Sequence, residues 1–471
     1  MTLIAGIDSS TQATKVEVRD LDSGEVVAAG SRPHPSTTPP RSEQDPQSWW
    51  SAFEGAWQHV GAPAVGAISV AGQQHGMVAL DSVGAVIRDA KLWNDTETAP
   101  DAGWLLKQLP SGAADWAAAC GSVPVAAFTI AKLSWLHRSE PDNWARLAHV
   151  LLPHDWMTYR LTGAMVTDRG DASGTGYWSA GTGEYCWDLL SIIDKDLDWS
   201  GVVPRVLGPL ESAGTWGDAV VAPGTGDNMA AALGLALQPG DAVVSLGTSG
   251  TVYSVSNTPT ADATGAVAGF ADATGRYLPL VCTLNATKVT DTVARLLGVD
   301  HAGLDALALA SPLGAGGVTL LPYFDGERTP NRPKATGVFT GIRSDATREQ
   351  IARAAVEGVV CGLLDGLDAL RSHVPELSRV ILVGGGSGSA ATVQSFADLC
   401  DLDVVVADAD QAVAAGAAVQ AAAVLQQTDP SEVARRWGLG ATRSVPRSES
   451  VTADAARAVR ARYGELSARM A

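Results

Sequence analysis

The sequence lacks both an apolar run long enough to cross a membrane and any clustering of cysteines. A bilayer-spanning helix needs roughly 20 apolar residues, whereas the most apolar segment, residues 412–425, is interrupted by Gly416 and Gln420. The amino terminus has no basic region and reaches Asp8 too early for a secretion signal. The five cysteines are scattered and form no Cys-x-x-Cys pair, which is typical of a reducing compartment. These absences predict a cytoplasmic protein.

Basic residues are also scarce. The chain has 33 lysines and arginines against 51 acidic residues, a formal charge of −18, and no basic run is longer than a pair. Nucleic acid and anionic membranes are therefore not expected as partners. The acidity is explained most simply by solubility. A polyphosphate bound to such a protein would need Mg²⁺ to offset the local charge.

Several familiar cofactor motifs are missing as well. The glycine-rich run at residues 384–388 is not Gly-x-Gly-x-x-Gly, because Ser389 replaces the last glycine, which argues against a dinucleotide oxidoreductase. No Gly-x4-Gly-Lys-[Ser/Thr] sequence is present, so a P-loop is excluded. The eight histidines show no zinc-binding spacing.

What the sequence does contain is two similar strand–turn–strand patterns, far apart in the chain. Apolar residues 3–7 lead into a hydroxyl-rich loop at residues 8–15, and residues 242–245 lead into a glycine- and threonine-rich loop at residues 246–251. Such hairpin tips carry small side chains, hydroxyls and free N–H groups that suit phosphate binding. One such loop alone is explained equally well by an ordinary turn. The pair, with an acidic loop at residues 224–228, favours a site for a polyphosphate and its metal.

Tryptophan distribution indicates two domains. Thirteen of the 14 tryptophans precede residue 217, and glycine and proline cluster at residues 217–240. A chain of 471 residues is long enough to form two or three domains, each with its own hydrophobic core. We therefore predict an N-terminal domain at residues 1–236 and a C-terminal domain at residues 237–471.

Strand and helix signals alternate, which predicts a mixed α/β fold. Strands are expected at residues 65–70, 380–383 and 403–407, the first two ending in glycine-containing loops where ligands bind in parallel sheets. Thr347 and Gln350 form a capping box for a helix that extends to residue 371. Asp410 is expected to cap the alanine-rich helix that follows it.

Asp227 is the strongest single candidate for a functional side chain. It lies among glycines, just before helix-like residues 229–235. Two roles are open: an N-cap, or a base that accepts the proton of a hydroxyl attacking a γ-phosphate. Asn228 is suited to orient a neighbouring hydroxyl.

Polar residues that follow a strand suggest a polyol site. Gln74 and His75 lie in the loop at residues 71–76 that ends the strand expected at residues 65–70, an unusual way to end a buried strand. Residues 93–95, Trp-Asn-Asp, combine an aromatic face with polar groups, as sugar sites do, although a core tryptophan is an equal alternative.

Taken in order, these motifs resemble those of the FGGY carbohydrate kinases, and among them most closely the xylulokinases. The resemblance runs from residue 4 to about residue 420. It rests on residues 6–15, 41–50, 72–76, 92–95, 152–155, 226–228, 245–250, 325–330, 337–341 and 384–386.

The resemblance implies a fold and an activity. The expected fold is α/β, with two actin-like, ribonuclease-H-like domains facing a central cleft, the N-terminal one binding sugar and the C-terminal one nucleotide. The expected cofactors are ATP and Mg²⁺, and the expected reaction phosphorylates D-xylulose at its 5-hydroxyl, giving D-xylulose 5-phosphate and ADP. The expected partners are the sugar and ATP, with no nucleic acid or membrane. Whether the protein forms a homodimer is left undecided by the resemblance.

Two alternatives remain open beside this activity. One is another kinase of the family, acting on ribulose, gluconate or a deoxy-hexulose. The other is a non-catalytic actin-like sugar sensor, which the presence of both Asp8 and Asp227 disfavours.

The resemblance also assigns individual residues. Asp227 matches the catalytic base, and Asp8 matches the acid that holds Mg²⁺ through water. The sugar-binding positions are Gln74, His75, Asp227 and Asn228. The phosphate-facing positions are Thr11, Thr14, Lys15, Gly247, Thr248 and Ser249, and those beside the nucleoside are Gly385 and Gly386.

Three positions depart from the family pattern. Gln74 stands where many xylulokinases have methionine, and Ala131 replaces the proline that usually precedes Lys132. Residues 387–389 are smaller than the usual polar side chains after the glycine run. None of these departures affects Asp8 or Asp227, so activity is expected.

Overall fold

The computed structural model describes residues 1–408 and 411–470, which form two compact units. The first unit comprises residues 1–237, 256–278 and 411–440, and the second comprises residues 238–255, 279–408 and 441–470. The chain first leaves unit 1 after Leu237, one residue beyond the predicted boundary. Two later segments return to it, so neither unit is one continuous stretch, which the sequence did not indicate.

Unit 1 is built on a seven-stranded sheet with the order β13-β14-β5-β1-β2-β3, and β15 also pairs with β5. The hairpin predicted at the amino terminus is formed by the antiparallel β1 and β2, whereas β1, β14 and β15 run parallel to β5. Parallel strands bring their carboxyl ends to one edge of the sheet. The strands are β1 (Leu3–Ser9), β2 (Ala13–Asp20), β3 (Val26–Pro33), β5 (Ala67–Gly72), β13 (Gly214–Trp216), β14 (Ala219–Val221) and β15 (Thr225–Gly226).

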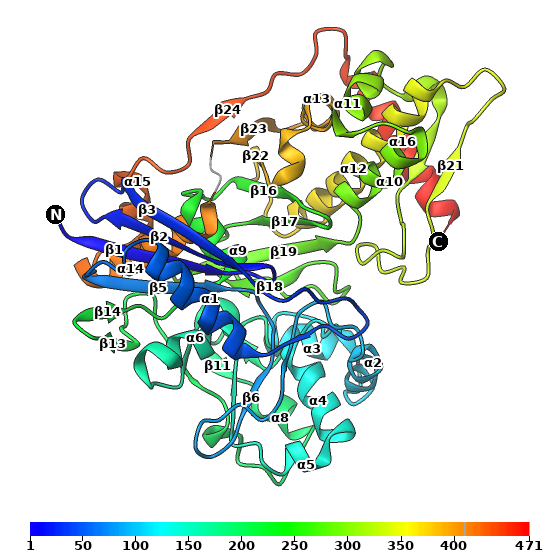
Figure 1. Ribbon diagram of the computed structural model, residues 1–471. Helices are drawn as coiled ribbons and strands as arrows, with labels where there is room; N and C mark the ends of the chain where they lie inside the picture. The colour runs from blue at the N-terminus through cyan, green and yellow to red at the C-terminus, as the bar shows by residue number, and fades with distance from the viewer. Residues whose placement is uncertain (409–410, 471) are drawn as a thin grey trace. The chain divides into compact units, whose positions relative to one another are not determined.

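The two faces of this sheet are covered differently. Ala5 and Ile7 belong to a tryptophan-rich core cluster that includes Trp49 of α1 (Pro46–His59). The intervening Gly6 faces the other way, because side chains alternate along a strand, and a Cβ there would overlap the backbone oxygen of Ala414. That residue lies in α14 (Ala412–Gln426), which packs beside β1 although about 400 residues separate them in the chain (Figure 1).

The rest of unit 1 consists of short helices and strands. The helices are α2 (Ala99–Leu106), α3 (Ala113–Cys120), α4 (Thr129–Ser139), α5 (Pro141–Trp144), α6 (Pro153–Thr162), α7 (Arg169–Ala172), α8 (Trp187–Ser191), α9 (Asp227–Gly234) and α15 (Pro430–Arg436). The short strands are β4 (Glu43–Gln44), β6 (Val78–Leu80), β7 (Ala90–Lys91), β8 (His149–Leu151), β9 (Val166–Asp168), β10 (Trp178–Ser179), β11 (Glu184–Tyr185), β12 (Arg205–Leu207) and β18 (Ala268–Ala271).

Unit 2 contains a second mixed sheet, with the strand order β19-β17-β16-β22-β23-β24. It too starts from a predicted antiparallel hairpin, β16 with β17, while β22 and β23 run parallel to β16. The strands are β16 (Asp241–Leu246), β17 (Gly250–Ser254), β19 (Tyr277–Thr283), β22 (Arg379–Val383), β23 (Asp403–Ala407) and β24 (Thr442–Ser444).

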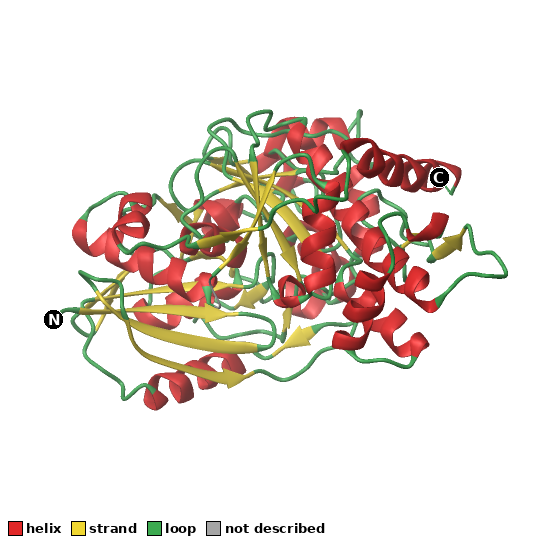
Figure 2. Ribbon diagram, turned by 90° about the horizontal axis from the view of Figure 1, so that it is seen from above, coloured by secondary structure: helices red, strands yellow, loops and turns green. Residues whose placement is uncertain are grey.

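The helices of unit 2 pack on this second sheet and on one another; Figure 2 draws helices red and strands yellow. These helices are α10 (Thr287–Leu297), α11 (His301–Ala310), α12 (Arg348–Arg371), α13 (Ala390–Leu399) and α16 (Ala453–Arg469), and a small sheet is formed by β20 (Thr319–Leu321) and β21 (Val338–Thr340).

The local predictions are confirmed, except that the strand expected at residues 65–70 lies two residues later, at Ala67–Gly72. Helix α12 begins after Thr347, and the capping box with Gln350 is present in both directions. The predicted cap Asp410 lies outside the described residues. Across residues 1–408 and 411–470, no helix has the length and apolar character needed to cross a membrane. Two sheets flanked by helices confirm the mixed α/β class.

Candidate active site

Three strand ends bring the strongest candidates of unit 1 together. In the parallel pairing, Ala71 of β5 lies opposite Asp8 of β1 on one side and opposite Thr225 of β15 on the other. Adjacent strands are about 4.8 Å apart, so Asp8 and Thr225 lie about two strand spacings apart. Gln74 follows the central strand, and Asp227 follows β15. The predicted acid, base and sugar-binding positions therefore share one edge of the sheet.

Asp227 is the first residue of α9, and Gly226 occupies the N-cap position. The alternative that Asp227 merely caps the helix is therefore wrong. Its Oδ1 atom accepts a hydrogen bond from Nδ2 of Asn228 at 2.9 Å, and the same Nδ2 donates to Oε1 of Gln74 at 2.8 Å. Burial raises the pKa of Asp227 to about 7, and the negative charge of Asp8 acts in the same direction, while the bonds from Asn228 oppose them. A carboxyl group with this pKa is suited to exchange a proton near neutral pH.

Asp8 is buried near the end of β1. Its Oδ2 atom lies 3.4 Å from Nζ of Lys15, across the β1–β2 hairpin, whereas its buried Oδ1 atom has no hydrogen-bond partner within residues 1–408 and 411–470. Burial raises the pKa of Asp8, and the charge of Lys15 lowers it in part. A buried carboxylate oxygen without a partner is costly and is well suited to a cation or to the water that a cation carries.

The tip of the first hairpin is linked to two neighbouring loops. The hydroxyl of Thr11 donates to Oε1 of Gln73 at 3.0 Å and accepts from Nε1 of Trp93 at 2.9 Å. Thr14 is fully buried, and its hydroxyl pairs with Nε2 of His34 at 2.8 Å. Of the predicted phosphate-facing residues in this loop, Thr14 thus already has a protein partner and Lys15 pairs with Asp8.

His75 is fixed by a hydrogen bond to its backbone and by contacts to its ring. Its backbone adopts a φ of +65°, which is uncommon for a residue other than glycine, and its carbonyl accepts from the hydroxyl of Thr129 at 3.1 Å. The imidazole packs against the rings of both Phe128 and Phe270, with centroid separations of 5.0 and 5.5 Å, and those two rings also contact each other. A Cβ on Gly174 would overlap the same ring. Sequence reasoning missed Phe270, which comes from the returning segment 256–278.

Gln74 presents an amide group at the same edge. Its Oε1 atom accepts from Asn228, while its Nε2 atom is buried and has no hydrogen-bond partner among the described residues. Gly226 lies against this side chain, because a Cβ there would be 2.7 Å from Cγ of Gln74. Through Asn228, the Gln74 side chain is therefore linked to the carboxylate of Asp227.

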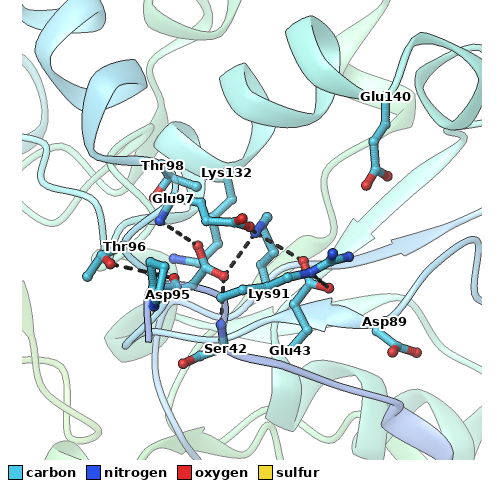
Figure 3. A network of polar contacts seen from close by, with 12 residues as sticks. Ser42, Glu43, Asp89, Lys91, Asp95, Thr96, Glu97, Thr98, Lys132 and Glu140 are labelled. Carbon is cyan, nitrogen blue, oxygen red and sulfur yellow. Dashed lines mark hydrogen bonds and ion pairs between the residues drawn. The ribbon is translucent and has the colours of Figure 1, made fainter. Parts of the chain in front are cut away.

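The residues at positions 93–95 separate into two roles. Trp93 is 39% exposed, so the core alternative is wrong for its ring. Asp95 is fully buried and accepts from Nζ of Lys91 at 2.9 Å. Figure 3 shows the Lys91 ammonium between Asp95, Glu43 and Glu97, at 2.8–3.0 Å. The charge of Lys91 thus offsets the negative charge of this acidic cluster.

A cavity of about 650 Å³ lies within unit 2. This volume is in the range of pockets that hold small ligands. Four of the predicted nucleotide positions line it, whereas Ser249 does not; the four are Gly247, Thr248, Gly385 and Gly386. Lining residues that sequence reasoning did not identify are Thr287, Thr290, Asp291, His301, Asp305 and Thr392.

Glycine is required where the two loops of this cavity approach each other. A Cβ on Gly386 would lie 2.8 Å from Cβ of Leu246 and 2.9 Å from Cγ2 of Thr287. Gly384 has a φ of +85° where the chain turns out of β22. The glycine run thus allows close backbone packing beside the cavity.

The chain belongs to the FGGY family of carbohydrate kinases: the model of the family's N-terminal domain matches residues 3–234, and that of its C-terminal domain matches residues 242–425. The chain is 46% identical over 447 residues to a xylulose kinase of Streptomyces rubiginosus, covering 92% of this chain and 90% of that protein. It is also 46% identical over 451 residues to a xylulose kinase of Streptomyces coelicolor, covering 93% and 91% of the two chains.

A solved structure agrees with this assignment. The crystal structure of xylulose kinase from Bifidobacterium adolescentis is similar to this chain with a TM-score of 0.88 and 40% identity, covering 99% of each chain. The predicted fold class, with two actin-like α/β domains, is thereby confirmed.

Proposed function

We propose that this protein is an ATP-dependent kinase that phosphorylates D-xylulose at its 5-hydroxyl, giving D-xylulose 5-phosphate and ADP. The identity of 46% to two xylulose kinases supports the substrate. The observation that carries the chemistry is Asp227, a half-buried carboxyl group with a pKa of about 7 at the end of a parallel strand. We also propose a cytoplasmic location, because all five cysteines are free thiols.

Asp227 acts as the base in this proposal. In its ionised form it accepts the proton of the attacking hydroxyl, which becomes a better nucleophile as the proton is transferred. The Asn228 amide fixes one carboxylate oxygen, leaving the other to face the hydroxyl. The N-terminus of α9 stabilises the ionised form until the sugar arrives.

The sugar is held by donors and aromatic surfaces around Asp227. The unpartnered Nε2 of Gln74 supplies a donor for a sugar oxygen. His75 presents an imidazole whose orientation is fixed by Phe128 and Phe270. The exposed ring of Trp93, tied to Thr11, offers an apolar face for the carbon chain.

The residues of the chain fit the expected nucleotide. Gly247, Thr248, Gly385 and Gly386 line the cavity of unit 2, which has the size expected for a nucleoside. The backbone and the threonine hydroxyl at the β16–β17 hairpin tip offer N–H and O–H donors that are suited to bind phosphate oxygens. Ser249 lies in the same hairpin loop, outside the cavity lining.

The chain also fits a magnesium ion at Asp8. The buried Oδ1 atom of Asp8 lacks a partner in the part of the chain that the structure describes, and a carboxylate is the ligand that Mg²⁺ prefers in phosphoryl-transfer enzymes. When bound, the ion offsets the charge of the phosphate oxygens during transfer. Lys15 pairs with Asp8 and supplies a second positive charge on the same hairpin.

The test is coupled ADP release with ATP and Mg²⁺ across D-xylulose, D-ribulose, L-ribulose, gluconate, glycerol and L-rhamnulose. The highest kcat/KM is expected with D-xylulose. A higher value with another sugar would keep the kinase chemistry but reject the substrate. Asp227→Ala is expected to abolish sugar-dependent ADP release while ADP still binds, as measured by calorimetry. Near-normal turnover of this variant would reject Asp227 as the base.

A further inference from the structure

Four buried residues near the ends of β5 and β15 have no role in the phosphoryl transfer proposed above. We call them the His154 cluster: His154 and Asp155 of α6, Asp168 at the end of β9, and Asp171 of α7. The Nε2 atom of His154 lies 3.1 Å from Oδ1 of Asp155, 3.3 Å from Oδ1 of Asp168 and 3.4 Å from Oδ2 of Asp171. The Nε2 atom of the imidazole thus faces all three carboxyl groups.

Burying the charged groups of this cluster costs free energy, because they lose their hydration. In the described part of the chain, no lysine or arginine forms an ion pair with its three carboxyl groups, so His154 is their one charged partner. Burial alone would lower the pKa of His154, but the attraction of the three carboxyl groups outweighs it and raises the pKa to about 9. Buried ion pairs usually stabilise a fold less than apolar side chains of similar size. A role other than stability is therefore worth seeking.

Asp168 connects the cluster to the strand that carries the base. Its Oδ2 atom accepts a hydrogen bond of 2.7 Å from the hydroxyl of Thr225, and both side chains are buried. Thr225 lies in β15, two residues before Asp227. Asp168 is itself fixed, because its carboxylate also accepts from the backbone N–H groups of Gly170 and Asp171 at 2.8 and 3.0 Å.

The His154 ring supports the same strand end through packing. A Cβ on Gly224 would lie 2.6 Å from Nδ1 of His154, and a Cβ on Gly72 would lie 2.9 Å from its Cβ atom. The carbonyl of Gly224 also accepts from Nε2 of Gln420 at 2.8 Å. Gly224 and Thr225, the residues that precede Asp227 by three and two positions, are therefore both fixed by side chains of neighbouring elements.

We propose that the His154 cluster positions Asp227: the bond between Asp168 and Thr225 fixes the end of β15 and with it the carboxylate that accepts the proton of the sugar. The inference rests on the proposed role of Asp227. Misplacement of a reacting group by about 1 Å can reduce a rate by about 100-fold. Thr225 and Asp168 touch neither substrate and act only through the strand, as positioning residues.

Thr225→Val and Thr225→Ser test the inference as a matched pair. Valine has the shape of threonine without the hydroxyl, whereas serine keeps the hydroxyl. Thr225→Val is expected to lower kcat with D-xylulose about 10- to 100-fold, with the KM for ATP changed less than about twofold. Thr225→Ser is expected to recover most of that turnover. The stoichiometry of ADP binding, measured by calorimetry, should stay at one per chain in both variants.

Asp168→Asn alters the acceptor of the Thr225 hydrogen bond and is expected to lower kcat as Thr225→Val does. A purely structural role would reduce the thermal midpoint and the ADP-binding fraction while leaving kcat per binding site unchanged, and that result would overturn the inference. Asp227→Asn in the same assay separates the two proposals. If Asp227→Asn is inactive and Thr225→Val turns over normally, the positioning role fails alone. If Asp227→Asn keeps its turnover, the proposed base and the positioning role fail together.

Discussion

Asn228 donates a hydrogen bond from Nδ2 to Oδ1 of Asp227, 2.9 Å away. This bond favours the ionised carboxylate and opposes the burial that raises the pKa of Asp227 to about 7. We expect Asn228→Ala to raise that pKa further and to lower kcat/KM at pH 7 about tenfold or more, because a bond to a charged group contributes roughly 1.5–3 kcal/mol. The loss should shrink as the pH rises toward 9. A loss of equal size at every pH would instead indicate that Asn228 acts only in sugar binding.

The pKa of Asp227 also predicts how the unmodified enzyme responds to pH. Only the ionised carboxylate accepts a proton, so kcat/KM for D-xylulose should fall as the pH decreases through about 7. The charge of Asp8 contributes to this raised pKa. A cation near Asp8 should therefore move the fall to lower pH, which a comparison of limiting and saturating Mg²⁺ will detect. A rate that is constant from pH 6 to pH 8 would contradict the assignment.

Asp8→Asn should weaken the response to magnesium. The substitution keeps the size of the side chain but removes the charge beside the partnerless Oδ1 atom. We expect the Mg²⁺ concentration for half-maximal activity to rise about tenfold or more, the range reported for residues that orient metal-bound groups. Asp22→Asn, in the exposed turn after β2, is the control and should leave the Mg²⁺ response unchanged. An unaltered requirement in Asp8→Asn would remove Asp8 from the metal site.

Two glycines of the unit 2 cavity offer a matched test of nucleotide binding. A Cβ on Gly386 would lie 2.8 Å from Leu246, whereas a Cβ on Gly388 would meet nothing within 4 Å. We therefore expect Gly386→Ala to raise the KM for ATP about tenfold with little change in the KM for D-xylulose, because the loop must shift to relieve the contact. Gly388→Ala should stay within about threefold of the unmodified protein. Equal effects of both substitutions would contradict a steric cause.

Local features of this fold could be predicted because their signals lie within one segment. The β1–β2 and β16–β17 hairpins follow from apolar runs around small, hydroxyl-rich turns. Helix α12 follows from its apolar spacing and from the capping box of Thr347. Each of these signals is complete within about 25 residues, so no distant contact is needed to interpret it.

The arrangement of the site depends on contacts that no local pattern contains. The register of β15 on β5 brings Asn228 to Gln74, which is 154 residues away. Phe270 reaches His75 because the segment 256–278 returns to unit 1. The resemblance to a known family supplied the candidates, but it could not show that Thr14 pairs with His34 or that Ser249 lies outside the cavity lining.

The last prediction concerns stability and the buried charge of His154. Its pKa is raised from 6.5 to about 9 in the folded protein by Asp155, Asp168 and Asp171, which overcome the opposing effect of burial. A raised pKa contributes stability that is fully present below pH 6.5 and is lost as the pH rises through about 9. Between pH 6.5 and pH 8.5 this loss amounts to about 2 kcal/mol, because each pKa unit corresponds to about 1.4 kcal/mol.

The thermal midpoint of the unmodified protein should therefore fall across this pH range, and that of His154→Gln should change less while starting lower. His59→Gln is the control, since His59 is exposed at the end of α1, and its midpoint should follow that of the unmodified protein. Cysteine thiols of the unfolded chain begin to ionise toward pH 8.5 and add the same fall to every variant, so the difference between the unmodified protein and His154→Gln isolates the contribution of the imidazole. A midpoint of the unmodified protein that stays constant or rises from pH 6.5 to pH 8.5 would show that the imidazole is not charged within its three carboxyl groups.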